Sequence, residues 1–347
     1  MLLQSVKSLS NISNRTMKIL HLTFHRSPQY DLEYVCQKLN LELETLYFHD
    51  YAANIYKPNR YKVTEQRAEI WWQDKKDFYQ SFDLIITSDT AGLSRIFLPH
   101  IDELKPRLIV WICDRFDYAI EADRQYPHLL NRIAQEKKLR LIPNTEIERI
   151  YCKQRGVVVT EPVIKPLGHR LPGRDMLPPQ DAAFMEEGDY ETAFYIPMYH
   201  NETKFMNLHR HCSALGLKTF HGAHRGADSL KRFKAIIHIP YAWSTWAFFD
   251  ALALNVPYLI PTERFLREMQ HRPGFWFQTD FDQDLLKHAE WYCDEHRHFM
   301  TYFDNWDDLV SKAQTTDWLE VRKKIAVFAQ DHHDRTIASW ETILPPK

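Results

Sequence analysis

The sequence predicts an α/β protein with two Rossmann-like domains. Its 347 residues are enough for two domains of ordinary size. Short apolar runs, typical of strands that are buried on both faces, alternate with stretches of helical periodicity. This alternation starts twice, on either side of a segment rich in Pro and Gly at residues 162–190. Strands separated by helices pair in parallel, so each half predicts a parallel sheet covered by helices on both faces.

The first half contains five apolar runs that predict strands. They lie at residues 17–24, 41–48, 82–89, 107–114 and 139–144. Residues 30–39 and 126–138 carry apolar side chains at helical spacing, and we therefore expect a first domain over residues 17–165. Residues 1–16 are rich in Ser and Asn and lack an apolar core, which predicts a disordered tail; the alternative is a transit peptide.

The second half repeats the pattern. Strands are expected at residues 192–199, 217–222, 234–241 and 256–262, with helices at 203–215 and 245–254. These elements predict a second domain over residues 191–325, joined to the first by a linker at 166–190. The remaining residues, 326–347, predict a C-terminal helix that can pack back on the first domain.

The composition excludes several classes of protein. The net charge of −2, without a run of like charges, argues against a nucleic-acid partner. Five scattered cysteines without a CxxC pair argue against a disulfide framework or a thiolate zinc site and favour a reducing, cytoplasmic location. No apolar run is long enough for a transmembrane segment. The nine glycines form neither GxGxxG nor a P-loop, which argues against a dinucleotide fingerprint.

The most informative segment is residues 238–262, where an apolar strand runs into Ser244 and Thr245. Both are good helix-capping residues, and the free N–H groups of a helix start attract anions such as a diphosphate. Asp250 follows one and a half turns later, where its carboxylate can accept hydrogen bonds from ribose hydroxyls. The alternative is a plain helix start with a solvent-facing Asp250.

The run D-A-L-A-L-N-V-P, which begins at Asp250, resembles the donor-binding signature of GT-B glycosyltransferases. In that signature a Glu or Asp, followed by Ala-hydrophobic-Ala and then Pro, binds the donor ribose. The resemblance covers residues 190–265 and extends to the first half as architecture only. It implies two domains that face a cleft, with the nucleotide-sugar on the second domain and the acceptor on the first. Many retaining members carry an acidic residue where this chain has Ala242, so the anomeric outcome stays open.

The loop after the first strand of the second domain offers His200, Asn201 and Lys204. The resemblance implies a cation here that neutralises the leaving diphosphate, and Lys204 fits best because it is charged at physiological pH. The alternative is that Asn201 caps a helix and Lys204 is solvated. Arg225, after the next strand, is a weaker candidate for contact with the base or phosphate.

The strand ends of the first domain provide candidates for the general base that the resemblance places on the acceptor side. They are His25, Asp89 and Asp114. A histidine can accept a proton from a hydroxyl near neutral pH, and a carboxylate can do the same or orient the histidine. The alternative for each Asp is a turn or cap residue. His25 is the first choice.

No metal site is expected. The D-x-D run at residues 280–284 directly precedes an expected helix, so these carboxylates are interpreted as caps. A group of four histidines and one cysteine lacks the spacing of a standard zinc site. Its members are His209, His211, Cys212, His221 and His224.

The resemblance to GT-B enzymes implies a hexosyl- or pentosyltransferase without a cofactor other than its nucleotide-sugar donor, and the absence of a convincing metal-ligand pattern predicts that it is metal-independent. The acceptor would be a hydroxyl of a glycan, a lipid-linked molecule or a protein. Two alternatives remain: another GT-B reaction, such as epimerisation or hydrolysis of the sugar-nucleotide, and a non-catalytic GT-B-like binding domain.

Overall fold

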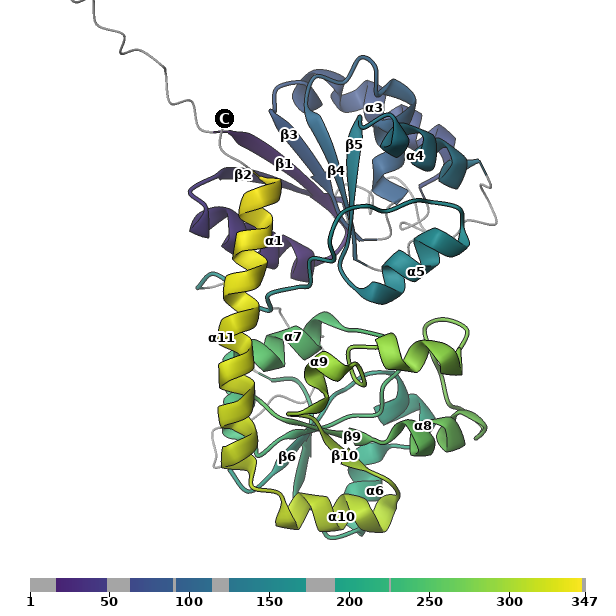
Figure 1. Cartoon of the computed structure of the whole chain (residues 1–347). Coiled ribbons are helices and arrows are strands. Elements are labelled where there is room, and N and C mark those ends of the chain that lie inside the picture. Colours follow the sequence, from purple (N-terminus) through teal and green to yellow (C-terminus); the bar gives the residue numbers. More distant parts are fainter. Residues whose placement is uncertain are drawn as a thin grey trace, which may run out of the picture.

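The computed structural model describes residues 17–48, 63–89, 92–113, 125–172, 191–224 and 226–344. They form two α/β lobes, each built on a five-stranded parallel sheet (Figure 1). The lobes face each other across a cleft that is lined by residues of both, including Ser27 and Asp250. The expected fold class, two Rossmann-like domains that face a cleft, is therefore confirmed.

The first lobe contains all five strands expected from the sequence. They are β1 (Lys18–Thr23), β2 (Glu42–Tyr47), β3 (Leu84–Thr87), β4 (Arg107–Ile112) and β5 (Leu139–Pro143), in the order β2-β1-β3-β4-β5. The α-helices are α1 (Arg26–Lys38), α3 (Glu65–Tyr79), α4 (Tyr126–Gln135) and α5 (Glu146–Gln154), and two short 3-10 helices are η1 (Gly92–Ile96) and η2 (Leu98–His100). Apolar side chains of the strands are buried on both faces of this sheet, as the continuous apolar runs predict.

The second lobe has shorter strands. They are β6 (Phe194–Ile196), β7 (Thr219–His221), β8 (Ile236–Ile237), β9 (Tyr258–Pro261) and β10 (Thr301–Phe303), in the order β10-β9-β8-β6-β7. The α-helices are α6 (Leu208–Ala214), α7 (Trp246–Ala253), α8 (Glu263–Gln270), α9 (Asp294–Arg297) and α10 (Trp306–Thr315). A π-helical turn η4 (Asn201–Phe205) and two 3-10 helices, η5 (Ala227–Arg232) and η6 (Gln283–His288), complete the lobe.

Helix α11 (Trp318–Ile343) runs along both lobes (Figure 1, yellow). Its first half buries Ile325 and Phe328 in the core of the second lobe. Its last turns bury Trp340 against the first sheet, where the Trp340 ring lies 5.1 Å from that of Trp111. The expectation that a C-terminal helix packs back on the first domain is confirmed, and the helix begins at Trp318, before the boundary of residue 326 that was expected for the second domain.

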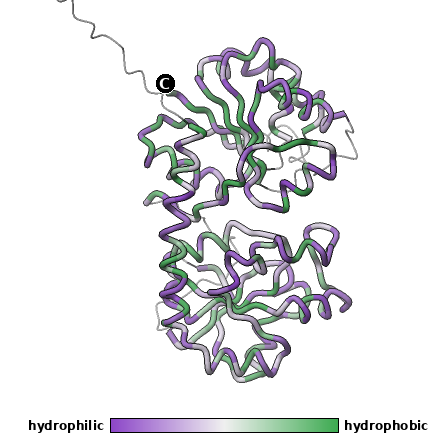
Figure 2. The backbone as a smooth tube through the Cα atoms, viewed as in Figure 1, coloured by the Kyte–Doolittle hydropathy of each residue, from purple (hydrophilic) through white to green (hydrophobic). Residues whose placement is uncertain are grey.

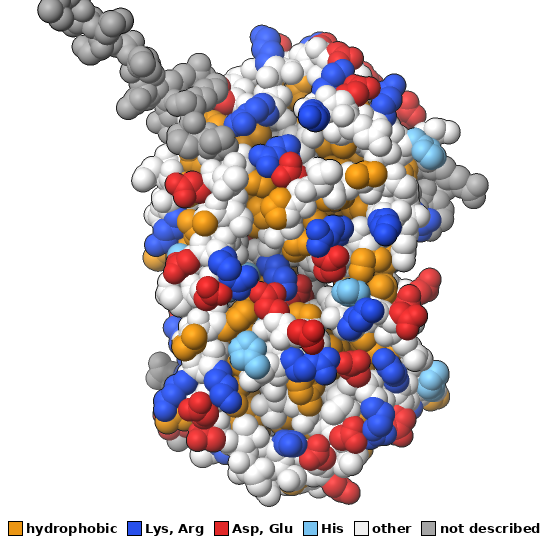
Figure 3. Space-filling model, in the orientation of Figure 1, with side chains coloured by type: hydrophobic (Ala, Val, Ile, Leu, Met, Phe, Trp, Pro, Cys, Tyr) orange, Lys and Arg blue, Asp and Glu red, His pale blue; other side chains and the backbone are white. Residues whose placement is uncertain are grey.

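The apolar residues concentrate along the strands at the centre of each lobe, whereas hydrophilic residues dominate the outer helices (Figure 2). On the face of the described chain seen in Figure 3, acidic and basic side chains are interspersed. None of the described helices is long and apolar enough to cross a bilayer.

The two lobes are joined by an extended crossover segment, residues 155–172, which overlaps the first part of the expected linker. The carboxylate of Asp31, on α1, accepts hydrogen bonds from Leu167 N (3.1 Å) and Gly168 N (3.0 Å). Gly168 has φ +68°, and a Cβ there would lie 2.1 Å from the carbonyl oxygen of Phe249 on α7. The crossover segment is thus fixed to both lobes. Residues 173–190 of the expected linker lie outside the described residues.

Candidate functional site

Both sheets turn the carboxyl ends of their strands toward the cleft, where ligands of open α/β sheets bind. Two adjoining cavities lie at these strand ends, and the larger of the two has a volume of about 270 Å³ and is lined mainly by the loops after β6, β7 and β8 and by the start of α7. A second cavity of about 180 Å³ includes the loops after β1 and β3 of the first lobe. The two cavities share Ser27, Tyr241, Thr245 and Trp246, so they form one continuous site.

The start of α7 forms one wall of this site. Thr245 is extended, and its hydroxyl accepts a hydrogen bond from Phe248 N (3.3 Å), which caps the helix as the sequence indicates. Thr245, Trp246 and Ala247 line the larger cavity, and Ser244 lines the smaller one. The positive end of the helix dipole and its unpaired N–H groups therefore lie at the cavity.

Asp250 lies on the same wall and is buried rather than solvent-facing. It forms an ion pair with Arg170 of the crossover segment, and both side chains line the larger cavity. Burial raises the pKa of Asp250 to about 6, although the Arg170 guanidinium acts in the opposite direction. Asp250 is thus placed where a ribose could reach it, but in this structure it is held by an arginine.

His25 and Asp89 form a hydrogen-bonded pair on the opposite wall. His25 Nδ1 lies 2.6 Å from Asp89 Oδ1, and both residues line the smaller cavity. The imidazole is 45% exposed and the carboxylate only 2%. The second carboxylate oxygen accepts hydrogen bonds from Thr23 Oγ1 (2.7 Å) and Phe24 N (2.6 Å). Burial alone would raise the pKa of Asp89, but these hydrogen bonds outweigh it and hold the pKa below its usual value.

The backbone supports this arrangement. Asp89 has φ +71°, in the left-handed region that a non-glycine residue rarely adopts. Cys113 N donates a hydrogen bond to the Asp89 carbonyl (3.0 Å), which ties the end of β3 to the end of β4. Such strained positions concentrate at functional sites because surrounding contacts must hold them. Asp114, the third candidate for the general base, lies outside the described residues. Arg225, the candidate for contact with the nucleobase or phosphate, also lies outside them.

The loop after β6 places the three residues expected to hold the diphosphate beside the cavity rather than on its wall. Asn201 is fully buried; its amide donates to Pro240 O and Trp276 O (both 3.1 Å) and accepts from Trp276 N (3.0 Å). The His200 ring stacks on that of Trp276 at 4.2 Å. Lys204 is exposed, with its ammonium 6.0 Å from the centre of the Trp276 ring. Their neighbour Tyr199 lines the cavity instead.

Several residues of the cavity walls were not expected from the sequence. They are Arg170, Tyr195, Met198, Tyr199, His224, Trp246 and Gln278. Arg170 lies in a stretch rich in Pro and Gly that predicts only a connection. The same segment also contains Lys165 and Arg174, so the charge of Arg170 alone does not indicate its place in the cavity.

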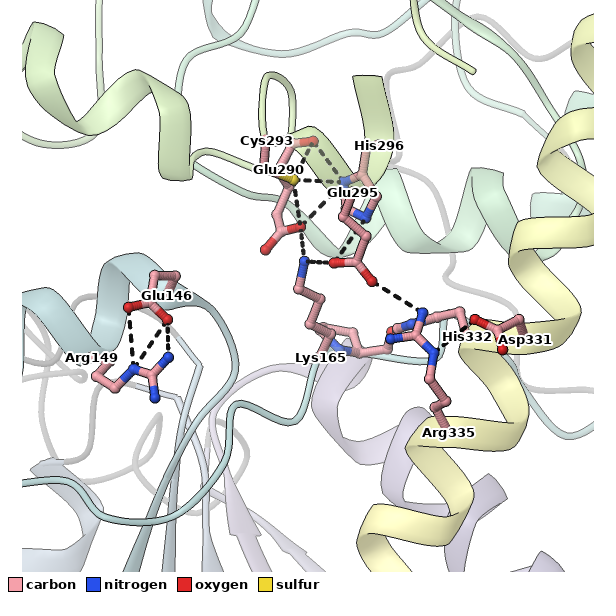
Figure 4. A network of polar contacts seen from close by, with 11 residues as sticks. Glu146, Arg149, Lys165, Glu290, Cys293, Glu295, His296, Asp331, His332 and Arg335 are labelled. Atoms are coloured by element: carbon pink, nitrogen blue, oxygen red, sulfur yellow. Dashed lines mark hydrogen bonds and ion pairs between the residues drawn. The ribbon is translucent and has the colours of Figure 1, made fainter. Parts of the chain in front are cut away.

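The described residues contain one group with the spacing of metal ligands, formed by Glu290, Cys293 and His296 (Figure 4). The Lys165 ammonium lies against this group, 2.7 Å from Glu290 and 2.6 Å from Glu295. His296 Nδ1 lies 2.7 Å from the Glu290 carbonyl and must donate to it, so this nitrogen has no lone pair for a metal. Burial would lower the pKa of Lys165, but the two carboxylates raise it above its usual value. In this structure the group forms an ion-pair network around Lys165.

The D-x-D run is a cap. The Asp282 carboxylate accepts a hydrogen bond from Asp284 N (2.9 Å) at the start of η6, a 3-10 helix rather than the expected α-helix. His209 bonds the hydroxyl of Thr219 (2.7 Å) and stacks on His221.

Two Rossmann-like lobes, each with a five-stranded parallel sheet, that face a common cleft give the chain an α/β fold of GT-B architecture. No protein-family model matches the chain, and no curated protein matches it. Solved structures with a similar course of the chain include the glycotransferase of kitacinnamycin, which is 10% identical with a TM-score of 0.46 over 94% of this chain and 99% of that one. The calicheamicin glycosyltransferase is 10% identical, with a TM-score of 0.45 over 95% and 98%. A putative UDP-N-acetylglucosamine 2-epimerase from Listeria monocytogenes is also 10% identical, with a TM-score of 0.47 over 96% and 98%. At these identities the similarity concerns the fold alone.

Proposed function

We propose that the chain is a glycosyltransferase that moves a hexosyl or pentosyl group from a nucleotide-sugar donor to an acceptor hydroxyl. The observation that supports this proposal most strongly is that two walls with different chemistry face one continuous site. One wall offers a helix start and a buried acid, which suit a nucleoside diphosphate. The other offers a histidine held by a carboxylate, which suits proton transfer from a hydroxyl.

On the donor wall, the diphosphate would lie at the start of α7, near Ser244 and Thr245. The Asp250 carboxylate would accept hydrogen bonds from the ribose hydroxyls. The nucleobase would occupy the far part of the larger cavity, against the wall formed by Tyr195, Gly222 and Ala223, where the Tyr195 hydroxyl donates to the Gly222 carbonyl (3.0 Å). Charge that develops on the leaving diphosphate would be stabilised by the dipole of α7.

On the acceptor wall, His25 would act as the general base. Asp89 is ionised because its pKa is lowered, so it accepts the Nδ1 proton of His25 and makes Nε2 the basic nitrogen. The acceptor oxygen would attack the anomeric carbon, its proton would pass to Nε2, and the bond to the diphosphate would break. Asp89 would stabilise the imidazolium that forms. This sequence inverts the anomeric configuration.

We also propose that the reaction needs no metal and takes place in a reducing compartment such as the cytoplasm. The helix dipole would supply part of the positive potential that a metal provides in other transferases. All five cysteines are free thiols in the structure. Full activity in the presence of a chelator would support the first statement, and complete loss restored by manganese or magnesium would contradict it.

The test of the function is a thermal-shift panel of UDP, GDP, CDP, ADP and TDP and their sugars, followed by product analysis with and without candidate acceptors. A ligand present at 100 times its dissociation constant stabilises the folded state by about 2.7 kcal/mol, which raises Tm by several degrees. We expect one base to give this shift. Transformation of the donor without an acceptor would indicate epimerisation or hydrolysis instead, and a panel without any shift would indicate a non-catalytic domain.

A further inference from the structure

We infer that Arg170 of the crossover segment binds the diphosphate of the donor while it keeps its contact with Asp250, so that the connection between the lobes is itself part of the donor site. This inference rests on the proposed function. It replaces Lys204, the cation expected from the sequence, by a residue on a different element.

The position of Arg170 is fixed by the backbone just before it. Asp31 holds the N–H groups of Leu167 and Gly168, and Gly168 lies directly against the backbone of Phe249 on α7. Two residues later, the side chain of Arg170 points to the cavity and is only 13% exposed. The guanidinium is therefore held in place before a ligand arrives, which reduces the entropy lost on binding.

The charge of the cavity requires such a residue. Among the described residues that line the larger cavity, Arg170 is the only Lys or Arg, whereas Lys204 lies outside that wall. Without a ligand, Arg170 and the carboxylate of Asp250 neutralise each other. A nucleoside diphosphate would bring further negative charge, and the N-terminus of α7 supplies only about half an elementary charge against it.

The Arg170 guanidinium can hydrogen-bond to the Asp250 carboxylate and to a phosphate at the same time. It has five N–H donors in one plane, and Asp250 accepts from only one of its terminal nitrogens, NH2. The remaining donors suit the paired oxygens of a phosphate, a geometry that a lysine does not offer. Asp250 in turn contacts Arg170 through Oδ2, which leaves Oδ1 to a ribose hydroxyl. The pair would thus recognise ribose and phosphate together.

The experiment compares each nucleoside diphosphate with its nucleoside by calorimetric titration of the full chain. In the wild-type protein, the diphosphate that raises Tm should bind far more tightly than the nucleoside. Arg170→Gln should weaken diphosphate binding by about 10- to 150-fold, the range for hydrogen bonds to charged groups, and should change nucleoside binding by less than about 3-fold. Arg170→Lys should recover only part of the loss.

Four further variants serve as controls for this comparison. Arg140→Gln removes an arginine that pairs with Glu161 (2.7 and 2.6 Å) away from the cavity, and it should bind both ligands like the wild type. If Arg170→Gln is unstable because Asp250 is left unpaired, Asp250→Asn and the double variant Arg170→Gln/Asp250→Asn are compared instead. The double variant should then show the weaker diphosphate binding. Lys204→Gln tests whether Lys204, the cation expected from the sequence, contributes to diphosphate binding.

The inference is overturned if Arg170→Gln binds diphosphate like the wild type, if it loses nucleoside and diphosphate equally, or if only Lys204→Gln loses diphosphate. In those cases the proposed function stands, because the wild-type protein still binds a nucleotide. Failure of the wild-type protein to bind any nucleotide would overturn both.

Discussion

At the scale of single residues, the proposed role of His25 as a general base depends on its contact with Asp89. A histidine that is half exposed to solvent but tied through Nδ1 to a buried carboxylate has a fixed ring orientation and a defined basic nitrogen. The sequence predicts His25, Asp89 and Asp114 only as separate strand ends. The contact between His25 and Asp89 could not be predicted, because it depends on the parallel pairing of β1 with β3.

We expect His25→Ala to lower kcat by about 10²- to 10⁴-fold with nearly unchanged donor affinity, since general-base assistance contributes this much. His100→Ala is the matched control. His100 also bonds carboxylates, those of Glu69 (2.8 Å) and Glu103 (2.7 Å), but it lines neither cavity of the cleft. Steady-state kinetics of the folded variants checks this. A near-normal rate for His25→Ala would move the role to Asp114 or indicate a retaining mechanism.

Buried histidines make stability depend on pH. Burial lowers the pKa of His332 to about 4, while its Nε2 donates to Pro166 O at 2.8 Å. Because this pKa lies below the value of 6.5 in the unfolded chain, the unfolded state binds more protons between pH 6.5 and 4. The contribution of a neutral His332 is therefore present above pH 6.5 and is lost as the pH falls through this window.

We expect His332→Gln, which keeps a donor for Pro166, to reduce the loss of unfolding free energy between pH 6.5 and pH 4 by about 2–3 kcal/mol. Denaturant titrations of both proteins at several pH values measure this difference. Asp31 titrates in the opposite sense, since burial raises its pKa to about 7, but it is present in both proteins and cancels. Parallel pH profiles would contradict the assignment.

At the scale of elements, the crossover segment depends on one glycine. Gly168 combines φ +68° with a space too small for a Cβ, which would lie 2.1 Å from Phe249 O. Gly156 has a similar φ of +72°, but a Cβ added there would meet nothing within 4 Å, so this second glycine separates the two effects. The comparison measures how closely the crossover segment packs on α7.

Gly156→Ala should cost about 1–2 kcal/mol, the penalty of a left-handed conformation. Gly168→Ala should cost about 1–3 kcal/mol more, because overpacking adds to that strain. Equilibrium unfolding in denaturant measures both. We also expect Gly168→Ala, but not Gly156→Ala, to weaken nucleotide binding, since Arg170 and Asp250 would shift together. Equal effects of the two substitutions would show that the contact with Phe249 is loose.

The elements of the first lobe could be predicted from the sequence because their strands are continuous apolar runs. The second lobe could be predicted less well. The helix expected at residues 203–215 is broken at Asn207, which adopts φ +49° and caps α6 with its side chain. Strand β10 was not expected, although it is as long as β6 and β7. Asp250 could be proposed from a local motif, whereas its partner Arg170 is remote in sequence and carries no motif of its own.

At the scale of the whole molecule, the residues proposed for donor binding and those proposed for acceptor activation face each other across the cleft between the lobes. The Asp250 wall belongs to the second lobe and the His25 wall to the first, and transfer of a sugar requires that water be excluded between them. Small changes in the angle between the lobes would therefore decide whether the site is productive.

We expect a saturating nucleotide to close the lobes, with a smaller radius of gyration in small-angle scattering and slower proteolysis of the Pro-rich connection at residues 162–190. Arg170→Gln, measured at saturating ligand, should close less if the phosphate contact drives the movement. Identical scattering and proteolysis with and without the nucleotide would contradict closure.

Helix α11 has a consequence for the order in which the chain acquires its structure. The strands of the first sheet are complete at Pro143, yet one face of that sheet is covered by Trp340 and Ile343. On a ribosome these side chains emerge about 200 residues later, roughly 10–40 s at ordinary elongation rates. Until then the nascent first lobe exposes an apolar face around Trp111, which is a binding surface for chaperones and a route to aggregation. Folding of the first lobe is therefore completed after synthesis of the second.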